Sequence, residues 1–446
     1  MNTQNKEDGK ILFVISTYWQ YENYIKTNAL EEIKDRVNFL VYPKLADLDF
    51  GIPKDRISLY SYPEKKDILH RHIFNMNSWR LRKRDIVFWL RSLLFKPNQR
   101  RAYRILAMPV VYNIVKAVFL KRAEDPKLTA LIQKINPAVV LLPSHAFEGR
   151  TFEIIRIAKK MKILSLMIID NWDTLANKTI FTEKPDYLGV WSRQHIEHAV
   201  NVKGMPRERI FVLGVPRFKT YIKPETKNWP SPYPFRYALF VGIAEFFNEL
   251  GALKKIDELI EKHGSDIKVV YRPNITQHTR NCPDVFFEYD FKHIVLDTPA
   301  KAYYKRSSTW DISKDSFNKI YYPDPNYYPK LLSNMEFMIS PQTTMILEAA
   351  LLGKKNYILA YDDGCHRFGP KFIFDNCIFL NGIECLPNVR MVRTFEDMEK
   401  IFISGDWMKQ QAEPVDVDYF VSKEATADYP ANLKKIISQI LTNPKD

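Results

Sequence analysis

Short apolar runs alternate with amphipathic stretches through the first half of the chain. The runs have the length and composition of strands buried on both faces, and the stretch 151–162 repeats its apolar residues with a helical period. Strands that alternate with helices in this way predict a parallel sheet with right-handed crossovers. The expected strands cover 11–17, 37–43, 138–144, 163–170, 187–192 and 209–218.

A proline-rich stretch, 224–235, interrupts this pattern. It holds four prolines in twelve residues, which is typical of a linker between domains. The alternation of strands and helices then restarts. The expected elements after it are strands at 237–243, 266–274 and 355–363 and helices at 246–264 and 432–443.

This pattern predicts an α/β protein of two doubly wound domains, in keeping with a length of 446 residues. A terminal helical segment follows the second domain. The predicted parts are an N-terminal domain at 1–223, the linker at 224–235, a C-terminal domain at 236–412 and the terminal segment at 413–446.

The stretch 337–355 predicts a buried strand, a sharp turn and a largely apolar helix. Ser340 stands where an N-cap residue belongs and Pro341 where the first helical residue belongs. Gly353 stands where the helix would end. We therefore expect the helix to begin directly after Ser340.

The start of this predicted helix has the chemistry of a nucleotide site. The backbone amides of Gln342, Thr343 and Thr344 would be unpaired there, and the helix dipole favours an anion such as a diphosphate. Glu348 lies about a turn deeper among apolar residues, where a carboxylate needs hydrogen-bond donors such as ribose hydroxyls. The alternative is a plain strand–helix unit in which Glu348 reaches solvent.

Other polar residues follow the expected strands of the second domain. Ligands of parallel sheets gather at the carboxyl ends of the strands, and Gly242, Arg272 and Asn274 all stand at such ends. The Arg272 guanidinium can pair with phosphate oxygens in two-point fashion, so we expect it to hold a diphosphate. The alternative for Arg272 is an ordinary surface ion pair.

Two stretches resemble GT-B-fold glycosyltransferases of bacterial surface polysaccharide (capsule or lipopolysaccharide) biosynthesis, a group similar to the CDP-glycerol glycerophosphotransferases. One is 337–355. The other is 190–218, where a strand ends in Trp191 and the chain later runs through Gly214 and Arg217 in the letters VLGVPRF. The resemblance implies two Rossmann-like domains facing a cleft, with a C-terminal helix packed back on the N-terminal domain.

The resemblance also implies which residues contact the donor. Asp297, Thr298 and Asp324 stand where the family holds the base and sugar of the nucleotide, although turn and cap roles explain them as well. Asn274 replaces the histidine common in CDP-glycerol enzymes, and this counts against a glycerophosphate donor. The implied partners are a nucleotide sugar and a glycan or lipid-linked acceptor.

Sugar transfer with inversion needs a general base for the acceptor hydroxyl. The strand ends near 144 and 170 supply His145, Glu148, Asp170 and Asp173 as candidates. Each of them taken alone could instead be structural. Lys178 in the same region and Arg193 after Trp191 are further polar residues at these strand ends.

The sequence contains no phosphate loop, no G-x-G-x-x-G, no H-E-x-x-H and no C-x-x-C motif. We therefore expect no metal and no cofactor besides the nucleotide-sugar substrate. In such a mechanism Arg272, Lys301 and the helix start at 340–344 would offset the charge of the leaving diphosphate.

Positive charge is concentrated in one predicted helical segment, 79–122. The net charge is +14, and residues 80–122 hold 12 Lys or Arg against one acid, Asp85, with aromatic residues interleaved. Such a segment favours an anionic membrane surface. The alternatives are a nucleic acid, a polyanionic glycan acceptor or a solvated face without a partner.

Four sparse cysteines, no apolar signal core before Ile11 and no transmembrane run lead us to expect a cytoplasmic protein, peripheral at the inner face of the membrane. The sequence thus predicts a metal-independent glycosyltransferase. The alternatives are a CDP-polyol polyolphosphotransferase, a nucleotide-sugar 2-epimerase and a basic nucleic-acid-binding protein. We expect no nucleic acid as partner, because the charge is local.

Overall fold

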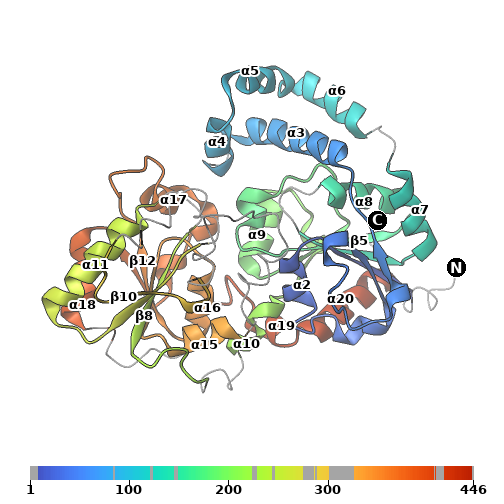
Figure 1. Cartoon of the computed structure of the whole chain (residues 1–446). Helices are drawn as coiled ribbons and strands as arrows, with labels where there is room; N and C mark the ends of the chain where they lie inside the picture. The colour runs from blue at the N-terminus through green and yellow to red at the C-terminus, as the bar shows by residue number, and fades with distance from the viewer. Residues whose placement is uncertain are drawn as a thin grey trace. The chain divides into compact units, whose positions relative to one another are not determined.

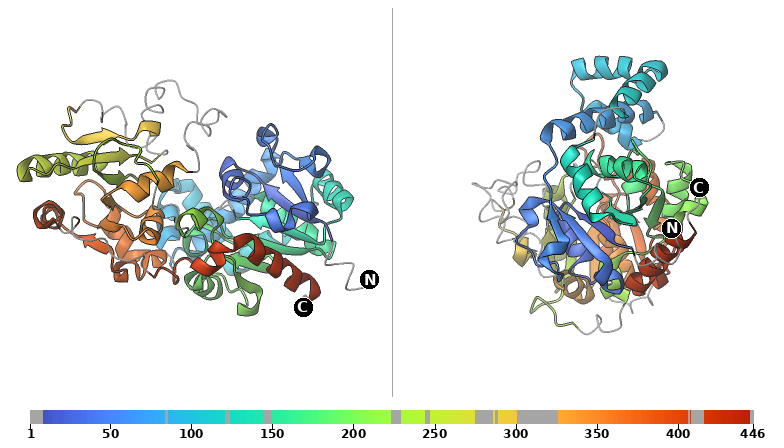
Figure 2. Two further views of the ribbon diagram at one scale, coloured as in Figure 1. Left: turned by 90° about the horizontal axis from the view of Figure 1, so that it is seen from below. Right: turned by 90° about the vertical axis from the view of Figure 1, so that its right-hand side faces the viewer.

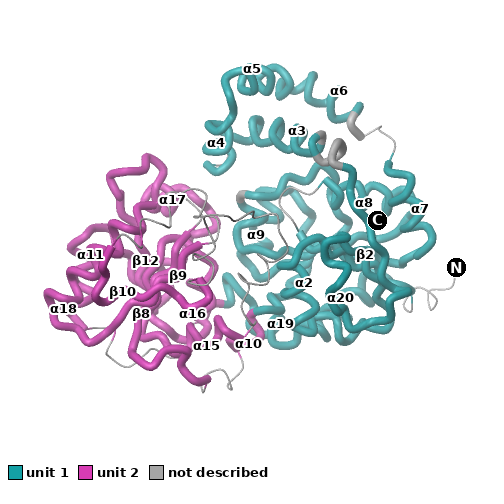
Figure 3. The backbone as a smooth tube through the Cα atoms, in the orientation of Figure 1, with its two compact units in different colours: residues 1–217, 418–446 teal, residues 218–417 magenta. Residues whose placement is uncertain are grey.

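The chain forms two compact units, which Figure 3 shows in separate colours. Unit 1 comprises Met1–Arg217 with Asp418–Asp446, and unit 2 comprises Phe218–Val417. The computed structural model describes residues 9–83, 86–120, 124–144, 149–222, 229–243, 247–274, 286, 289–300, 326–405, 407 and 416–443.

Unit 1 contains a seven-stranded parallel sheet in the order β3-β2-β1-β4-β5-β6-β7. The strand order reverses direction between β1 and β4, so the carboxyl ends of these two strands mark the topological switch point. The strands are β1 (Ile11–Ile15), β2 (Val37–Val41), β3 (Ile57–Leu59), β4 (Val139–Pro143), β5 (Leu164–Ile168), β6 (Tyr187–Val190) and β7 (Ile210–Val212).

Helices cover this sheet on both faces. The terminal helix α20 (Tyr429–Thr442) packs its apolar stripe, including Leu433 and Ile437, into the same core as the strands. The C-terminal helix therefore belongs to the N-terminal unit, as the fold class predicts. The other helices around the sheet are α2 (Tyr18–Tyr24), α7 (Pro126–Ile135), α8 (Gly149–Lys160), α9 (Arg193–Asn201) and α19 (Lys423–Ala427).

Four consecutive helices form an arm on unit 1. Helix α3 contacts α8 on one side and α5 on the other, so α5 and α6 lie farther from the sheet than α3 does (Figures 1 and 2). Ile73, Phe95, Tyr103 and Tyr112 form a small core of the arm's own. The helices are α3 (Glu64–Leu81), α4 (Ile86–Leu93), α5 (Pro97–Leu106) and α6 (Pro109–Leu120).

Unit 2 contains a six-stranded parallel sheet in the order β10-β9-β8-β11-β12-β13. Its switch point lies between β8 and β11. Two short strands, β10 and β13, were not predicted from the sequence, because runs of three or four residues carry little periodicity. The strands are β8 (Tyr237–Val241), β9 (Lys268–Arg272), β10 (Ile294–Leu296), β11 (Phe337–Ser340), β12 (Lys355–Leu359) and β13 (Val389–Val392).

The helices of unit 2 enclose its sheet. Helix α11 ends at Gly264, which has a positive φ of 61° and caps the helix as a glycine does best. The helices are α10 (Lys219–Ile222), α11 (Glu249–His263), α15 (Tyr327–Asn334), α16 (Met345–Leu351), α17 (Pro370–Asn376) and α18 (Phe395–Ser404).

The α/β fold class predicted from the sequence is confirmed, but the predicted helix start after Ser340 is wrong. Ser340 is the last residue of β11 and pairs with Ile358 of β12, so the strand ladder extends through it. Helix α16 begins only at Met345. Gly353, with a φ of 70°, follows the end of the helix as expected. In the described residues, no helix is long and apolar enough to cross a membrane.

Candidate functional site

The carboxyl edge of the unit 2 sheet brings Arg272 to the first residue of α16. Arg272 ends β9, and its Nη2 donates a 2.7 Å hydrogen bond to the hydroxyl of Tyr328. Its Nη1 lies 3.6 Å from Sδ of Met345, the residue that begins α16. The guanidinium therefore extends from β9 toward the turn that holds Gln342, Thr343 and Thr344.

That turn contains two buried polar side chains without partners. Gln342 is 7% exposed and Ser340 is 1% exposed. Among the described residues, neither amide atom of Gln342 nor the hydroxyl of Ser340 has a hydrogen-bond partner. Each such group costs about 1–3 kcal/mol when it is left unsatisfied. Such groups call for a partner that folding does not supply, and a polar ligand is one candidate.

Asp297, just beyond β10, lies in a cluster of tyrosines. Its carboxylate accepts a 2.7 Å hydrogen bond from the Tyr233 hydroxyl and another from Tyr327, while the Thr298 amide donates to the Tyr233 oxygen at 3.0 Å. Burial raises the pKa of Asp297 even though these hydrogen bonds and Arg272 favour its charged form. The predicted contacts Asp297 and Thr298 thus lie near Arg272 and already have protein partners.

Glu348 is buried, so the alternative in which it reaches solvent is wrong. It lies in α16 and accepts a 2.6 Å hydrogen bond from the Tyr221 hydroxyl of α10. Tyr328 lies within the electrostatic reach of Glu348, Asp297 and Arg272, and burial raises its pKa while Arg272 opposes that shift. The donor required by the buried carboxylate is thus supplied by the protein itself.

Gly242 packs closely against the buried side chain of Glu249, which leaves no room for a side chain at position 242. A Cβ atom there would lie 2.5 Å from Oε2 of Glu249 and 3.1 Å from the backbone nitrogen of Asn274. Glu249 accepts hydrogen bonds from the Ile243 amide at 2.8 Å and from the Tyr271 hydroxyl at 2.6 Å. Glu249 therefore braces the turn after β8, a role the sequence did not reveal.

In unit 1, Asp170 follows β5, and its amide, its carbonyl and its carboxylate all form hydrogen bonds within the protein. Its carboxylate accepts a hydrogen bond from the Tyr24 hydroxyl, and its amide donates to Oγ of Ser144 at 2.9 Å. Its carbonyl accepts a 3.1 Å hydrogen bond from Arg217. Burial, and next the charge of Asp170, raise the pKa of Tyr24 well above its ordinary range.

Asp173 is more accessible than Asp170. It precedes a π-helical turn, Thr174–Lys178, and its carboxylate forms a 2.7 Å ion pair with Lys178. Its side chain is 20% exposed. The other predicted residues, His145, Glu148, Lys301 and Asp324, lie outside the described residues.

The stretch with the letters VLGVPRF is a tightly packed turn of unit 1. Gly214 has a φ of 83°, and a Cβ atom there would lie 2.5 Å from the backbone nitrogen of Thr426. The Arg217 guanidinium lies 4.9 Å from the ring centre of Trp19 and 5.1 Å from that of Trp191. Arg193, by contrast, is 75% exposed on the surface of α9.

His195 and His198, both in α9 of unit 1, stay neutral because they are buried. Nε2 of His195 donates to the Trp172 carbonyl at 2.7 Å, while its Nδ1 accepts a hydrogen bond from the Trp191 amide at 3.3 Å. Desolvation lowers the pKa of His195 to about 3 and that of His198 to about 4. This pair was missed because nothing in the sequence indicates its burial.

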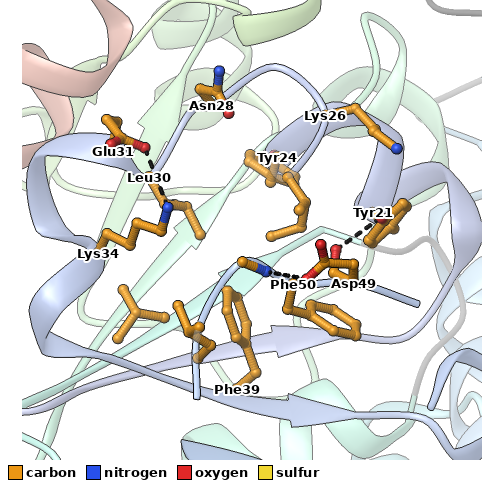
Figure 4. Close-up of a pocket in the computed structure, with 14 residues that line it drawn as sticks. Tyr21, Tyr24, Lys26, Asn28, Leu30, Glu31, Lys34, Phe39, Asp49 and Phe50 are labelled. Carbon is orange, nitrogen blue, oxygen red and sulfur yellow. Dashed lines mark hydrogen bonds and ion pairs between the residues drawn. The ribbon is translucent and has the colours of Figure 1, made fainter. Parts of the chain in front are cut away.

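Unit 1 also has a pocket of about 220 Å³, shown in Figure 4. Tyr24 forms part of its wall, together with Lys26, Lys34 and Asp49. No residue that the sequence marked as a site residue lines it. Tyr24 is therefore the lining residue that connects the pocket with Asp170, because its hydroxyl donates to the Asp170 carboxylate.

Within the described ranges, no three His, Cys, Asp or Glu side chains lie close enough together to hold a metal ion. The Arg272 guanidinium and the hydrogen-bonding groups of Ser340 and Gln342 lie at the described unit 2 edge. Arg272, Gln342 and Ser340 are suited to a polar, anionic ligand.

No protein-family model matches the sequence, and no curated protein matches it. Solved structures do align with nearly the whole chain. UDP-GlcNAc 2-epimerase from Methanocaldococcus jannaschii aligns over 94% of this chain and 97% of its own, with 12% identity and a TM-score of 0.52. S. aureus MnaA, in a co-structure with UDP, aligns over 97% of this chain and 96% of its own, with 12% identity and a TM-score of 0.52.

The chain thus has a GT-B-like fold of two α/β units, which it shares with these two proteins. The wall teichoic acid polymerase TagF also aligns, over 99% of this chain and 91% of its own, with 12% identity and a TM-score of 0.48. A shared fold does not by itself define an activity, because function depends on the residues of the site.

Proposed function

We propose that this protein is a glycosyltransferase that moves a sugar from a nucleotide-sugar donor to a glycan or lipid-linked acceptor in surface polysaccharide biosynthesis. The observation that carries the proposal is the pair of buried, unpartnered side chains Gln342 and Ser340 beside Arg272. The resemblance of 190–218 and 337–355 to polysaccharide glycosyltransferases supports the same class.

In this proposal, unit 2 binds the donor. Arg272 offsets the charge of the diphosphate, which grows on the leaving group as the glycosidic bond breaks. The Gln342 amide both donates and accepts hydrogen bonds, so its partner should offer both, as nucleobase edges and sugar hydroxyls do. Thr343 and Thr344, which are only half-buried, would contribute backbone amides to the same ligand.

The acceptor would bind to unit 1, where Asp173 is the better of the two described bases. Asp170 is 3% exposed and is engaged by Tyr24, so a hydroxyl acceptor has poor access to its carboxylate. Asp173 keeps an exposed fraction of 20%, and its carboxylate pairs with Lys178 at 2.7 Å. His145 and Glu148 remain proposed alternatives for the base.

The donor proposal is tested by thermal unfolding with UDP, GDP, CDP, CMP and ADP at equal concentrations. A nucleotide present at about 100 times its Kd should stabilise the protein by about 2.7 kcal/mol. Arg272→Ala should abolish this response. Arg393→Ala is the matched control, because Arg393 follows β13 at the same sheet edge and pairs with Asp375 at 2.9 Å. If no nucleotide stabilises the wild type, the proposal fails.

The reaction is tested by following the preferred nucleotide sugar in the presence of EDTA, with and without a membrane extract as the source of acceptor. Transfer predicts nucleotide release that requires the acceptor and persists in EDTA. Conversion of the sugar to an epimer without an acceptor would instead favour a 2-epimerase. Release of CMP from a CDP-polyol would favour a polyolphosphotransferase.

A further inference from the structure

Helix α6 is apolar on two faces, and only one of them is covered. Tyr112 and Val115 pack into the small core of the arm. Val110, Ile114 and Val118 stand four residues apart and therefore share another face, where they are 70%, 59% and 61% exposed. A helix that is apolar all round is normally buried, so this face lacks the environment that its residues favour.

Further exposed apolar side chains lie in the neighbouring elements. Leu94, between α4 and α5, is 79% exposed, Ile105 in α5 is 60% exposed, and Met108, between α5 and α6, is 55% exposed. Of the twelve large hydrophobic side chains that are exposed in the described part of the chain, six lie between 94 and 118. Such concentration marks an interaction surface rather than scattered exposure.

The surface around this face is positive. Residues 86–120 contain six Lys or Arg and no Asp or Glu. Arg101 and Arg104 are exposed, and neither of them forms an ion pair with a described residue. Their charge is therefore available to an external anion.

We propose that α5 and α6 dock on an anionic phospholipid bilayer. Val110, Ile114 and Val118 enter the boundary between headgroups and acyl chains, and Arg101 and Arg104 meet the lipid phosphates. Charge complementarity and exposed apolar area are both needed for this mode of binding. A duplex nucleic acid would use the cations alone and leave the apolar face in water. The helices lie on the membrane, because none of those described is long and apolar enough to cross it.

The test is flotation of the full chain with vesicles of phosphatidylcholine alone and of an equal mixture of phosphatidylcholine and phosphatidylglycerol. We expect binding to the mixed vesicles, weakened by salt, and little binding to the neutral ones. Arg101→Gln/Arg104→Gln should weaken it on the order of 30-fold. The charge control is Lys127→Gln/Lys134→Gln, two exposed lysines elsewhere on unit 1 that should not affect binding.

The apolar contribution needs its own variant. Val110→Ser/Ile114→Ser/Val118→Ser should abolish flotation without unfolding the protein, because all three side chains are exposed. Ile403→Ser/Val202→Ser, also at exposed apolar positions, should float like the wild type. The proposal is overturned if mixed vesicles do not bind, if the arm variants bind them as the wild type does, or if the arm cations bind a DNA duplex and not vesicles. None of these results depends on whether a nucleotide binds to unit 2.

Discussion

Buried glutamines near the carboxyl edges of the two sheets differ in whether their side-chain amides have hydrogen-bond partners. In unit 1, Gln20 accepts a 2.7 Å hydrogen bond from the Ser16 amide, and Gln194 accepts one of 2.7 Å from Nε1 of Trp172. In unit 2, Gln342 is also buried, yet its amide has no partner among the described residues.

This difference separates two structural glutamines from one that is suited to a ligand. Folding alone supplies partners for Gln20 and Gln194, so these two side chains stabilise the native state. Gln342 costs stability on folding, and only a further partner can recover that free energy. Local violations of a folding rule that persist in a well-packed region are where function is expected. The two edges can be told apart by what their residues do when they are changed.

Acid should produce the largest effect, through the neutral histidines behind the unit 1 edge. The folded-state pKa values of about 3 for His195 and about 4 for His198 lie below the ordinary value of 6.5, so the unfolded chain takes up protons first as the pH falls. Stability from the neutral rings is complete above pH 6.5 and is lost progressively below it. Each ring should cost about 2 kcal/mol at pH 5.

Urea unfolding of the full chain at pH 7 and pH 5 measures this loss. The variant His195→Asn/His198→Asn should be less stable at pH 7, since the His195 hydrogen bonds are lost, but it should change less between the two pH values. A pH dependence identical to that of the wild type would show that these rings do not cause it.

Next in size is the effect of removing Asp170. Asp170→Ala leaves the buried Tyr24 hydroxyl without its acceptor and should lower the free energy of unfolding by about 3 kcal/mol. Asp173→Ala is the control, because it removes one partly exposed ion pair and should cost less than about 1 kcal/mol. Equal losses in chemical denaturation would contradict the structural role of Asp170.

A smaller loss is expected for Gln194→Met, which keeps the side-chain volume but removes the acceptor of the Trp172 indole. The buried N–H is then unpaired, so we expect a loss of about 2 kcal/mol in the free energy of unfolding. Nucleotide binding by unit 2 should not change. An undiminished stability would mean that the hydrogen bond contributes little and would weaken the contrast between the two edges.

The long apolar strands were predictable because burial on both faces leaves a continuous apolar run, as in β4 and β8. The start of α16 was not, since Ser340 and Pro341 have the types of a cap while the ladder with β12 keeps Ser340 in a strand. Sequence spacing identifies residues within one turn of chain but not partners brought together by folding.

The tyrosines at the candidate site illustrate that limit. Tyr233 is 64 residues from Asp297, and Tyr221 is 127 residues from Glu348, so no local pattern joins them. Arg272 and Gln342 could be singled out because the strand-end rule applies to each alone. The lack of a partner for Gln342 could be seen only in three dimensions, and so could the exposure of Val110 and Ile114 on α6.

The most direct test of the account is the substitution Gln342→Met, measured both without ligand and with the nucleotide that stabilises the wild type. Removing an amide that has no partner breaks no hydrogen bond, so the free protein should keep its stability or gain about 1 kcal/mol. The stabilisation by nucleotide, by contrast, should disappear. A free protein that loses about 2 kcal/mol, as expected for Gln194→Met, together with an unchanged response to nucleotide, would show that Gln342 is a structural residue and would contradict the donor site.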